Sequence, residues 1–103
     1  MSMRHRLPNR RVSETFDIES QGLTFTVTAS RFADGKLGEI FIVNHKAGSM
    51  AGINASDAAV VCSLALQFGV PLETIRRALM RDSSGRASGP LATALDLIAD
   101  IEL

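Results

Sequence analysis

The amino-acid sequence predicts a small α+β domain, in which an N-terminal three-stranded antiparallel β-meander is followed by three α-helices packed on the sheet. Two observations predict this class. Residues 13–43 hold three segments with strand patterning separated by turn signals, and residues 54–100 carry apolar residues at helical spacing. A length of 103 residues fits one domain with one core. We expect a flexible basic arm at 1–11 and a single domain at 12–103.

The first two strands are predicted by strict alternation. Residues 13–19 and 23–30 alternate apolar with polar side chains, and the polar positions of the second segment are mostly threonine. Alternation of apolar and polar side chains with a period of two, with β-branched residues on the solvent-exposed face, is typical of a strand with one buried side. A turn is expected at Gln21-Gly22.

The third strand is predicted at 37–43, after the hairpin signal Asp34-Gly35. Its residues 40–43 are all apolar, so both faces carry apolar side chains. A meander leaves this strand at an edge, where two uncovered apolar faces favour aggregation. Either the chain's own helices sandwich the strand or a second subunit covers it. We expect a homodimer through the third strand, and the sandwich is the alternative.

The first helix is predicted to follow a loop at 44–52. Asn54 can serve as its N-cap, with Asp57 three residues later in a near capping box. Gly69 has the position of a glycine that ends a helix in the left-handed conformation. The residues expected to pack inward are Ala58, Val61, Cys62, Ala65, Leu66 and Phe68.

Two shorter helices are expected after Gly69. Pro71 fits the first turn of the second helix, the polar run 82–85 breaks it, and Pro90 fits the first position of the third, after a cap at Ser88 or Gly89. Inward-facing positions are Leu72, Ile75, Leu79 and Met80 in the second helix, and Leu91, Leu95, Leu97 and Ile98 in the third.

Composition limits the classes of function. Eleven basic and eleven acidic residues give zero formal net charge, so no general attraction to nucleic acid or an anionic membrane is expected. Cys62 is the only cysteine, which excludes an intramolecular disulfide. No apolar run approaches the ~20 residues of a membrane-spanning helix, and no signal peptide is recognisable. We expect a cytoplasmic protein without membrane contact.

No catalytic or metal-binding constellation is recognisable. Nucleophilic catalysis needs a nucleophile, a base and an orienting group, whereas the only histidines are His5 and His45. Cys62 lies in the apolar helical stripe, where thiols are usually inert. No residues have metal-ligand spacing. We expect no catalytic residue, metal or cofactor.

Three segments are candidates for binding phosphate. The connection with His45, Lys46, Gly48 and Ser49 follows a strand and precedes a helix, so its amides can cradle an anion, although its residue order is not that of a P-loop. An ordinary polar connection is the alternative. The other candidate phosphate ligands are Arg81 and Arg86 in the linker 81–89, and Arg10 and Arg11 in the arm. A solvated loop with an internal Arg–Asp pair is the alternative for the linker.

Residues 64–79 also resemble a helix-turn-helix. Gly69 occupies the turn, and Arg76 with Arg77 would lie on the second helix. Against DNA binding stand Pro71, an apolar residue after it, and the zero net charge.

Several runs in the sequence are similar to one known family. They are Leu7-Pro8-Asn9-Arg10-Arg11, Glu39-Ile40-Phe41-Ile42, Lys46-Ala47-Gly48-Ser49, Ser63 to Glu73 (SLALQFGVPLE), Gly89-Pro90 and Ala94-Leu95-Asp96. Over about residues 7–100 the chain resembles the TSCPD domain, found near the C-terminus of adenosylcobalamin-dependent ribonucleotide reductases.

The resemblance implies an accessory role. The reductase's radical chemistry and its cobalamin site belong to a large barrel that this sequence lacks, and its electron delivery uses a cysteine pair where this chain has Cys62 alone. The Thr-Ser-Cys-Pro-Asp motif is missing, so the metal binding associated with it is not expected. We expect a non-catalytic module that binds the reductase, a nucleotide or nucleic-acid phosphate. The alternatives are a helix-turn-helix DNA binder and a structural dimerisation module.

Overall fold

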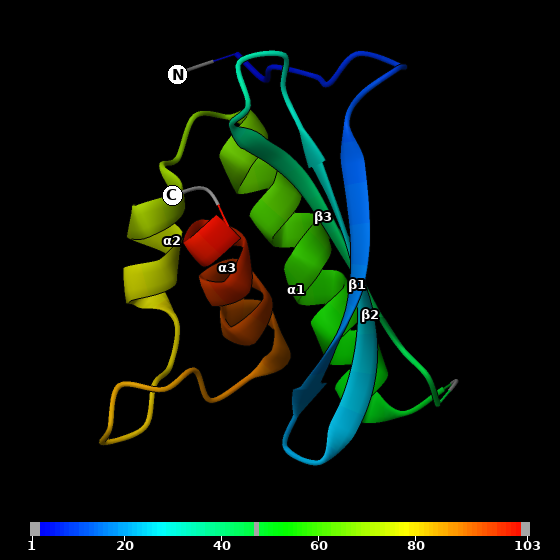
Figure 1. Ribbon diagram of the computed structural model, residues 1–103, viewed down its shortest axis with the longest axis vertical. Helices are drawn as coiled ribbons and strands as arrows, with labels where there is room; N and C mark the ends of the chain where they lie inside the picture. The colour runs from blue at the N-terminus through cyan, green and yellow to red at the C-terminus, as the bar shows by residue number, and fades with distance from the viewer. Residues whose placement is uncertain (1–2, 47, 102–103) are drawn as a thin grey trace.

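The computed structural model describes residues 3–46 and 48–101 and confirms the predicted α+β fold (Figure 1). Three strands precede three helices in the described part of the chain. Their bounds are β1 Ser13–Ser20, β2 Leu23–Arg31, β3 Leu37–Asn44, α1 Met50–Gln67, α2 Leu72–Ala78 and α3 Pro90–Ile101.

The strands form one antiparallel sheet in the order β1-β2-β3, as expected for a meander. In its register Phe16 lies opposite Val27, and Val27 lies opposite Ile42. The alternation predicted for β1 and β2 is confirmed, because their inward side chains are buried and their threonines face outward. The predicted turn is present at Gln21-Gly22, where both residues have positive φ, the geometry of a tight two-residue hairpin.

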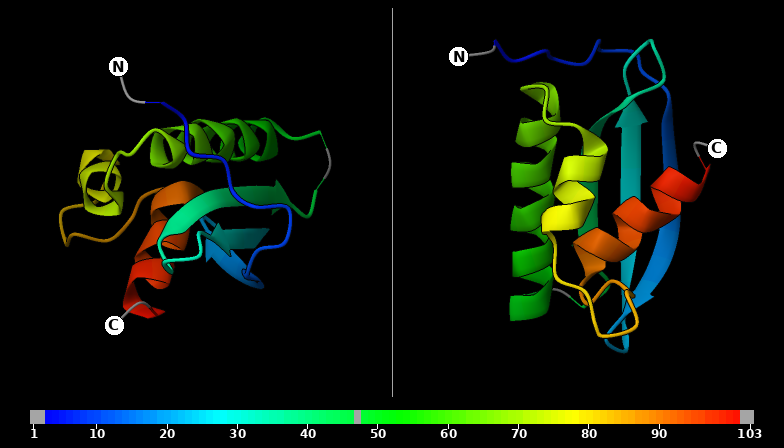
Figure 2. Two further views of the ribbon diagram at one scale, coloured as in Figure 1. Left: turned by 90° about the horizontal axis from the view of Figure 1, so that it is seen from above. Right: turned by 90° about the vertical axis from the view of Figure 1, so that its left-hand side faces the viewer.

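The helices cover only one face of the sheet (Figures 1 and 2). α1 packs along β3 and α3 crosses β1, whereas α2 packs outside against α3. The apolar core therefore lies between the inner sheet face and these helices. Its largest fully buried side chains are Phe25, Val27, Ile40, Ile42, Leu95 and Ile98.

β3 has one covered and one uncovered face. Ile40 and Ile42 are buried under the helices, while Phe41 is 45% exposed and Val43 is 61% exposed on the outer face. The alternative in which this chain's own helices sandwich β3 is therefore wrong. The homodimer stays a prediction, because a single chain leaves the outer face open.

α1 begins five residues earlier than predicted. Ser49 is its N-cap, since its Oγ accepts a hydrogen bond from the Gly52 N–H at 3.1 Å. The prediction of Asn54 as N-cap was wrong because two polar residues competed for that role, and only Ser49 has its side chain directed at a free N–H of the first turn.

The buried face of α1 also differs from the predicted stripe. Its buried residues are Ala55, Ala59, Cys62, Ser63, Leu66 and Gln67. Val61 is 66% exposed and Phe68 is 41% exposed, so the prediction was wrong for both. α1 is apolar on opposite sides, and its smaller side chains face the sheet because they allow the helix to approach β3 closely.

Two polar side chains of α1 bind the free backbone edge of β3. The Ile40 N–H donates to Ser63 Oγ at 2.9 Å, and the Ser63 hydroxyl lies 3.0 Å from the Ile40 carbonyl oxygen. Gln67 Nε2 donates to the Gly38 carbonyl oxygen at 3.0 Å. These bonds take the place of a neighbouring strand and satisfy buried polar groups that would otherwise be costly.

The termination of α1 by Gly69 and the start of α3 at Pro90 were predicted correctly, whereas two of the predicted inward-facing residues were not. Gly69 has a φ of 95°, as predicted for a helix-terminating glycine, and α3 begins at Pro90. Met80 and Leu97 are exposed, so the prediction that they pack inward was wrong. Met80 lies beyond the end of α2, which is one turn shorter than its apolar pattern suggested.

Asp96 on α3 holds the second helix and the segment after it. Arg81 donates to both of its carboxylate oxygens, each at 2.8 Å, and Arg76 Nε donates at 3.0 Å. These hydrogen bonds, that of Arg81 first, hold the pKa of Asp96 below its ordinary value. α2 has no fully buried residue, but Leu72 and Ile75 pack half-buried against the core, and the ion pair of Arg76 with Asp96 adds a polar attachment to α3.

The basic arm lies against the domain although residues 3–12 form no helix or strand. The His5 N–H donates to the Gln67 carbonyl oxygen at 2.7 Å, and Arg4 Nε donates to Gln67 Oε1 at 2.6 Å. Arg11 forms an ion pair with Glu39 on β3 at 3.0 Å. The described part of the arm is thus attached near both of its ends.

We predict that Ser63→Ala lowers the free energy of unfolding by about 1 to 3 kcal/mol, because the edge groups of Ile40 lose their partner while buried. Denaturant unfolding measures the change. Ser56→Ala, on the exposed side of the same helix, is the control and should change stability by less than about 0.5 kcal/mol. Equal effects of the two substitutions would contradict the role assigned to Ser63.

We predict that Asp96→Asn destabilises the protein at pH 7 by about 1 to 3 kcal/mol, because hydrogen bonds to two arginines lose a charged acceptor. The pKa of Asp96 is lowered in the folded state. The stabilisation is therefore complete above the unfolded pKa of about 4 and disappears as pH falls through the folded pKa. Denaturant unfolding between pH 7 and pH 2 should show the two proteins converging. A pH-independent difference would disprove this account.

Candidate functional site

The eight residues predicted to bind phosphate lie in three separate places. Arg10 and Arg11 are in the arm, beside the β2–β3 turn at one end of the sheet (Figure 1). At the opposite end, His45, Lys46, Gly48 and Ser49 form the β3–α1 connection, and Arg81 and Arg86 belong to the α2–α3 connection. The structure does not bring them together in one site.

Hydrogen-bond donors of the β3–α1 connection are already bonded to acceptors within the protein. Asn44 Oδ1 accepts the Lys46 N–H at 2.8 Å, and the amide of Gly52, in the first turn of α1, is bonded to Ser49 Oγ. His45 Nε2 lies 2.7 Å from Thr26 Oγ1 on the outer sheet face. Residue 47 of this loop lies outside the described residues. An anion would have to compete with these bonds, which favours the interpretation of an ordinary polar connection.

The α2–α3 connection is closed around a carboxylate. Asp82 Oδ1 accepts the Ser84 hydroxyl at 2.6 Å, the Arg86 N–H at 3.0 Å and the Ser84 N–H at 2.8 Å. These hydrogen bonds, that of the Ser84 hydroxyl first, hold the pKa of Asp82 below its ordinary value. The Arg81 guanidinium donates to Asp96 on α3 and, at 3.3 Å, to the Gly85 carbonyl oxygen within the loop. The Arg86 side chain remains exposed.

The helix-turn-helix segment presents little basic surface. Arg76 is bonded to Asp96 and to Glu73, and both contacts raise the pKa of its guanidinium. Arg77 is exposed. α2 has only seven residues, with Pro71 as its N-cap. Of the two arginines predicted to meet DNA, Arg76 is thus held within the fold.

Further basic residues meet the arm at the β2–β3 turn. Two adjoining cavities, of about 300 and 530 Å³, share Pro8, Phe32 and Ala33 in their walls. We define the arm–turn groove by Arg10, Arg11, Arg31 and Lys36 around Pro8 and Phe32. Arg31 and Lys36 were not predicted as ligands, because nothing in the sequence signals that the arm folds back to the turn.

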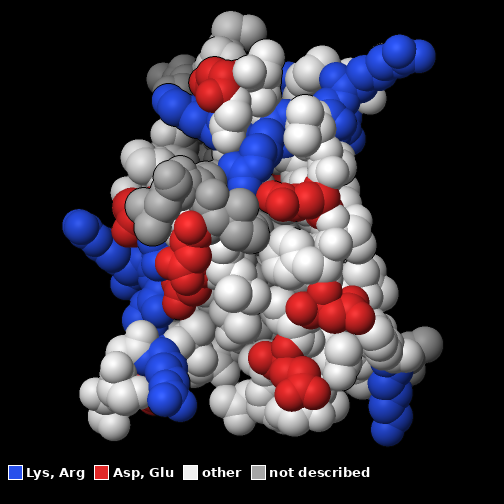
Figure 3. Space-filling model, viewed as in Figure 1, with Lys and Arg blue, Asp and Glu red and all other residues white. Residues whose placement is uncertain are grey.

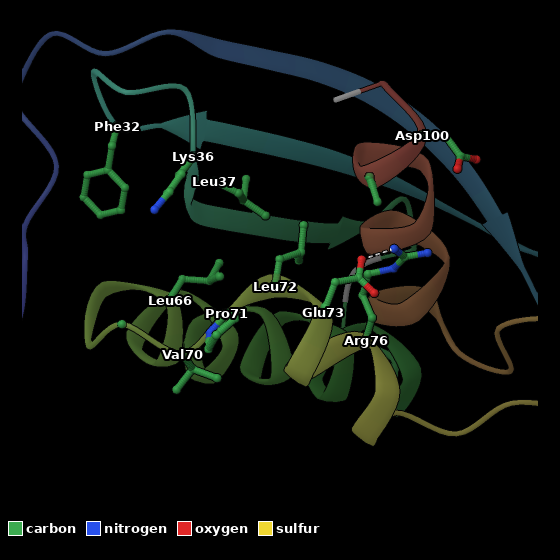
Figure 4. A pocket seen from close by; sticks show the side chains of 12 residues that line it. Phe32, Lys36, Leu37, Leu66, Val70, Pro71, Leu72, Glu73, Arg76 and Asp100 are labelled. Carbon is green, nitrogen blue, oxygen red and sulfur yellow. Dashed lines mark hydrogen bonds and ion pairs between the residues drawn. The ribbon is translucent and has the colours of Figure 1, made fainter. Parts of the chain in front are cut away.

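A larger cleft of about 680 Å³ lies between the β2–β3 turn, the end of α1, α2 and the end of α3 (Figure 4). Leu37, Leu66 and Leu72 give it an apolar floor. Lys36 lies at one end and the Glu73–Arg76 pair at the other. Among the described residues that line the cleft, none is Ser, Thr, Cys or His.

Cys62 is buried as predicted. Burial raises the pKa of its thiol to about 11, so it is protonated near neutral pH and poorly nucleophilic. Among residues 3–46 and 48–101, no three His, Cys, Asp or Glu side chains are grouped in a way that could hold a metal ion. Within the same residues, no helix is both long and apolar enough to span a bilayer.

The outer side of α1 carries an exposed apolar stripe. We define the α1 outer face by Ile53, Asp57, Val60, Val61, Leu64 and Phe68, which follow one another at helical spacing. Its five apolar residues are between 38% and 66% exposed. Asp57 is the only charged residue of α1. The sequence signalled this stripe but gave no means of deciding which side of α1 faces the sheet.

Comparisons with known proteins identify the family. Residues 3–101 match the TSCPD domain. A vitamin B12-dependent ribonucleotide reductase of Agrobacterium fabrum is 41% identical over 70 residues, which are 68% of this chain and 6% of the relative. The reductase of Bradyrhizobium diazoefficiens is 37% identical over 71% of this chain and 6% of its own length.

In the relative from Streptantibioticus cattleyicolor, the corresponding figures are 36% identity, 70% of this chain and 12% of the relative. This chain thus spans a small fraction of each reductase that it matches. No solved structure matches the chain. The match to the domain covers nearly all of the sequence, and the chain belongs to the TSCPD domain family, whose members include a part of vitamin B12-dependent ribonucleotide reductases.

Proposed function

We propose that this chain is a non-catalytic accessory module that binds a vitamin B12-dependent ribonucleotide reductase through the α1 outer face. The observation that carries the proposal is the exposure of five large apolar side chains along one side of an 18-residue helix. A helix that is apolar on opposite sides is normally covered on both. Contiguous exposed apolar surface of this kind marks sites of protein contact.

The relatives indicate which protein covers this face. In each of them the matching segment is a minor part of a long reductase chain. A domain of that kind has the rest of the reductase beside it at high effective concentration. A partner surface complementary to α1 is therefore most readily supplied by the reductase itself.

The structure also limits how the partner binds. Ser63 and Gln67 already occupy the backbone edge of β3 at Ile40 and Gly38. Addition of a partner strand there would displace α1 from the sheet. The contact is therefore made by side chains packing on α1, with Asp57 as the one charged group that the partner must pair or leave in water.

We predict that Val61→Asp weakens binding to the reductase by at least tenfold, because a carboxylate would be desolvated in an apolar contact. Val61 is the most exposed apolar residue of the α1 outer face, so its replacement should leave the fold intact, as circular dichroism can verify. The affinity is measured from the binding of the purified chain to surface-immobilised reductase.

Thr74→Asp places the same charge on the exposed side of α2 and is the matched control. It should bind like the unmodified chain. Absence of binding by the unmodified chain at 100 µM, which is about −5.5 kcal/mol, would refute the proposed function. Equal binding of both variants would refute the assignment of the face.

Self-association through the outer face of β3 is a second candidate, favoured by the exposure of Phe41 and Val43 on adjacent outward positions of this strand. We predict a homodimer in sedimentation experiments that Phe41→Ser converts to a monomer, because the contact loses its largest apolar side chain. Thr15→Ser, on the same face of β1, is the control. A monomeric unmodified chain at 100 µM would rule this candidate out.

A further inference from the structure

The arm–turn groove brings together three segments that are distant in sequence. Arg10 and Arg11 come from the arm, Arg31 from the end of β2, and Lys36 from the turn that leads into β3. Its two cavities share Pro8 and Phe32 in their walls, and the three arginines line one cavity while Lys36 lines the other. Lys and Arg side chains gather at this end of the molecule, at the top of the view in Figure 3.

The groove carries an excess of positive charge. Arg11 is paired with Glu39, and Arg31 with Glu14, each at 3.0 Å. Both guanidinium groups line the groove while these pairs hold them in place. Arg10 and Lys36 are exposed at the rim. Among residues 3–46 and 48–101, Asp34 is the only acidic residue that lines either cavity. The lining therefore favours an anion.

The arm is held in the position that the groove requires. Gln67 binds it at Arg4 and His5, and the Arg31 N–H donates to the Val12 carbonyl oxygen at 3.0 Å on the other side. Arg11 also donates to the Pro8 carbonyl oxygen at 2.9 Å, which bends the segment between them. A groove fixed in this way loses less entropy on binding than a free basic tail would.

Phe32 supplies an aromatic wall. A Cβ atom at position 38 would lie 2.6 Å from the Phe32 ring, so the ring packs directly on the backbone of Gly38. It is half-buried and borders both cavities. An aromatic ring beside arginines is an arrangement that binds a planar ring by stacking and a phosphate by charge-assisted hydrogen bonds.

We propose that the arm–turn groove binds a small organic phosphate that carries more than one phosphate group, with Arg10 and Arg11 as ligands in one cavity, Lys36 as a ligand in the other, and a planar ring against Phe32, which borders both. This site lies apart from the α1 outer face and does not depend on the proposed function. Of the residues predicted to bind phosphate, only Arg10 and Arg11 belong to this site. The others lie in the β3–α1 and α2–α3 connections.

NMR titration of the full, isotope-labelled chain tests the site. ATP is the probe, and tripolyphosphate and adenosine, the two parts of ATP, are titrated separately. ATP should shift the amide signals of residues 9–12 and 31–36. Arg10→Ala and Lys36→Ala should each weaken ATP binding by about three- to tenfold, the effect of losing one charge-assisted contact. Arg77→Ala, an exposed arginine on α2, is the control and should bind ATP normally.

Tripolyphosphate should bind at least about fivefold more weakly than ATP, because it lacks a ring to stack. The proposal is overturned if 10 mM ATP shifts none of these signals, if both alanine variants bind as the unmodified chain does, or if tripolyphosphate binds as tightly as ATP. Tighter binding of a DNA duplex than of ATP, with the same signals shifted, would overturn the assignment to a small ligand.

Discussion

The hydrogen bonds that Ser63 makes to both backbone groups of Ile40 determine where α1 lies in this fold. A three-stranded meander has two free edges, and the edge at β3 carries buried apolar side chains next to unpaired backbone groups. Ser63 and Gln67 supply the missing partners from a helix instead of a strand. Because these polar side chains and small alanines must face the sheet, the larger apolar residues of α1 face outward.

Gln67 connects this edge to the rest of the molecule. Its side chain binds Gly38 on β3 and Arg4 in the arm, and its carbonyl oxygen accepts the His5 N–H. The same residue thus holds the arm over the β2–β3 turn, where the basic groove forms. The exposed side of α1 and the groove both follow from the packing of α1 on β3 through Ser63 and Gln67. They offer separate surfaces for a protein and for a small anion.

The sheet could be predicted from the sequence because the period-two alternation of β1 and β2 and the turn signals around Gly22 and Gly35 are local. The rotation of α1 could not, because apolar residues lie on opposite sides of the helix and Ser63 has no recognisable role until β3 is beside it. Among the candidate ligands, Arg10 and Arg11 were recognised as arm residues, whereas Lys36 lines the adjoining cavity only because the arm folds back to the turn.

Hydrogen exchange at the single amide of Ile40 tests this account most directly. If the Ser63 hydroxyl holds that N–H between α1 and β3, its exchange should be slow in the native protein, as slow as that of amides bonded between β2 and β3. Replacement of Ser63 by alanine should then accelerate hydrogen exchange at the Ile40 amide selectively, while the amides bonded between β2 and β3 stay protected. Rapid exchange of Ile40 in the unmodified chain would show that the edge is open and that something other than α1 must close it.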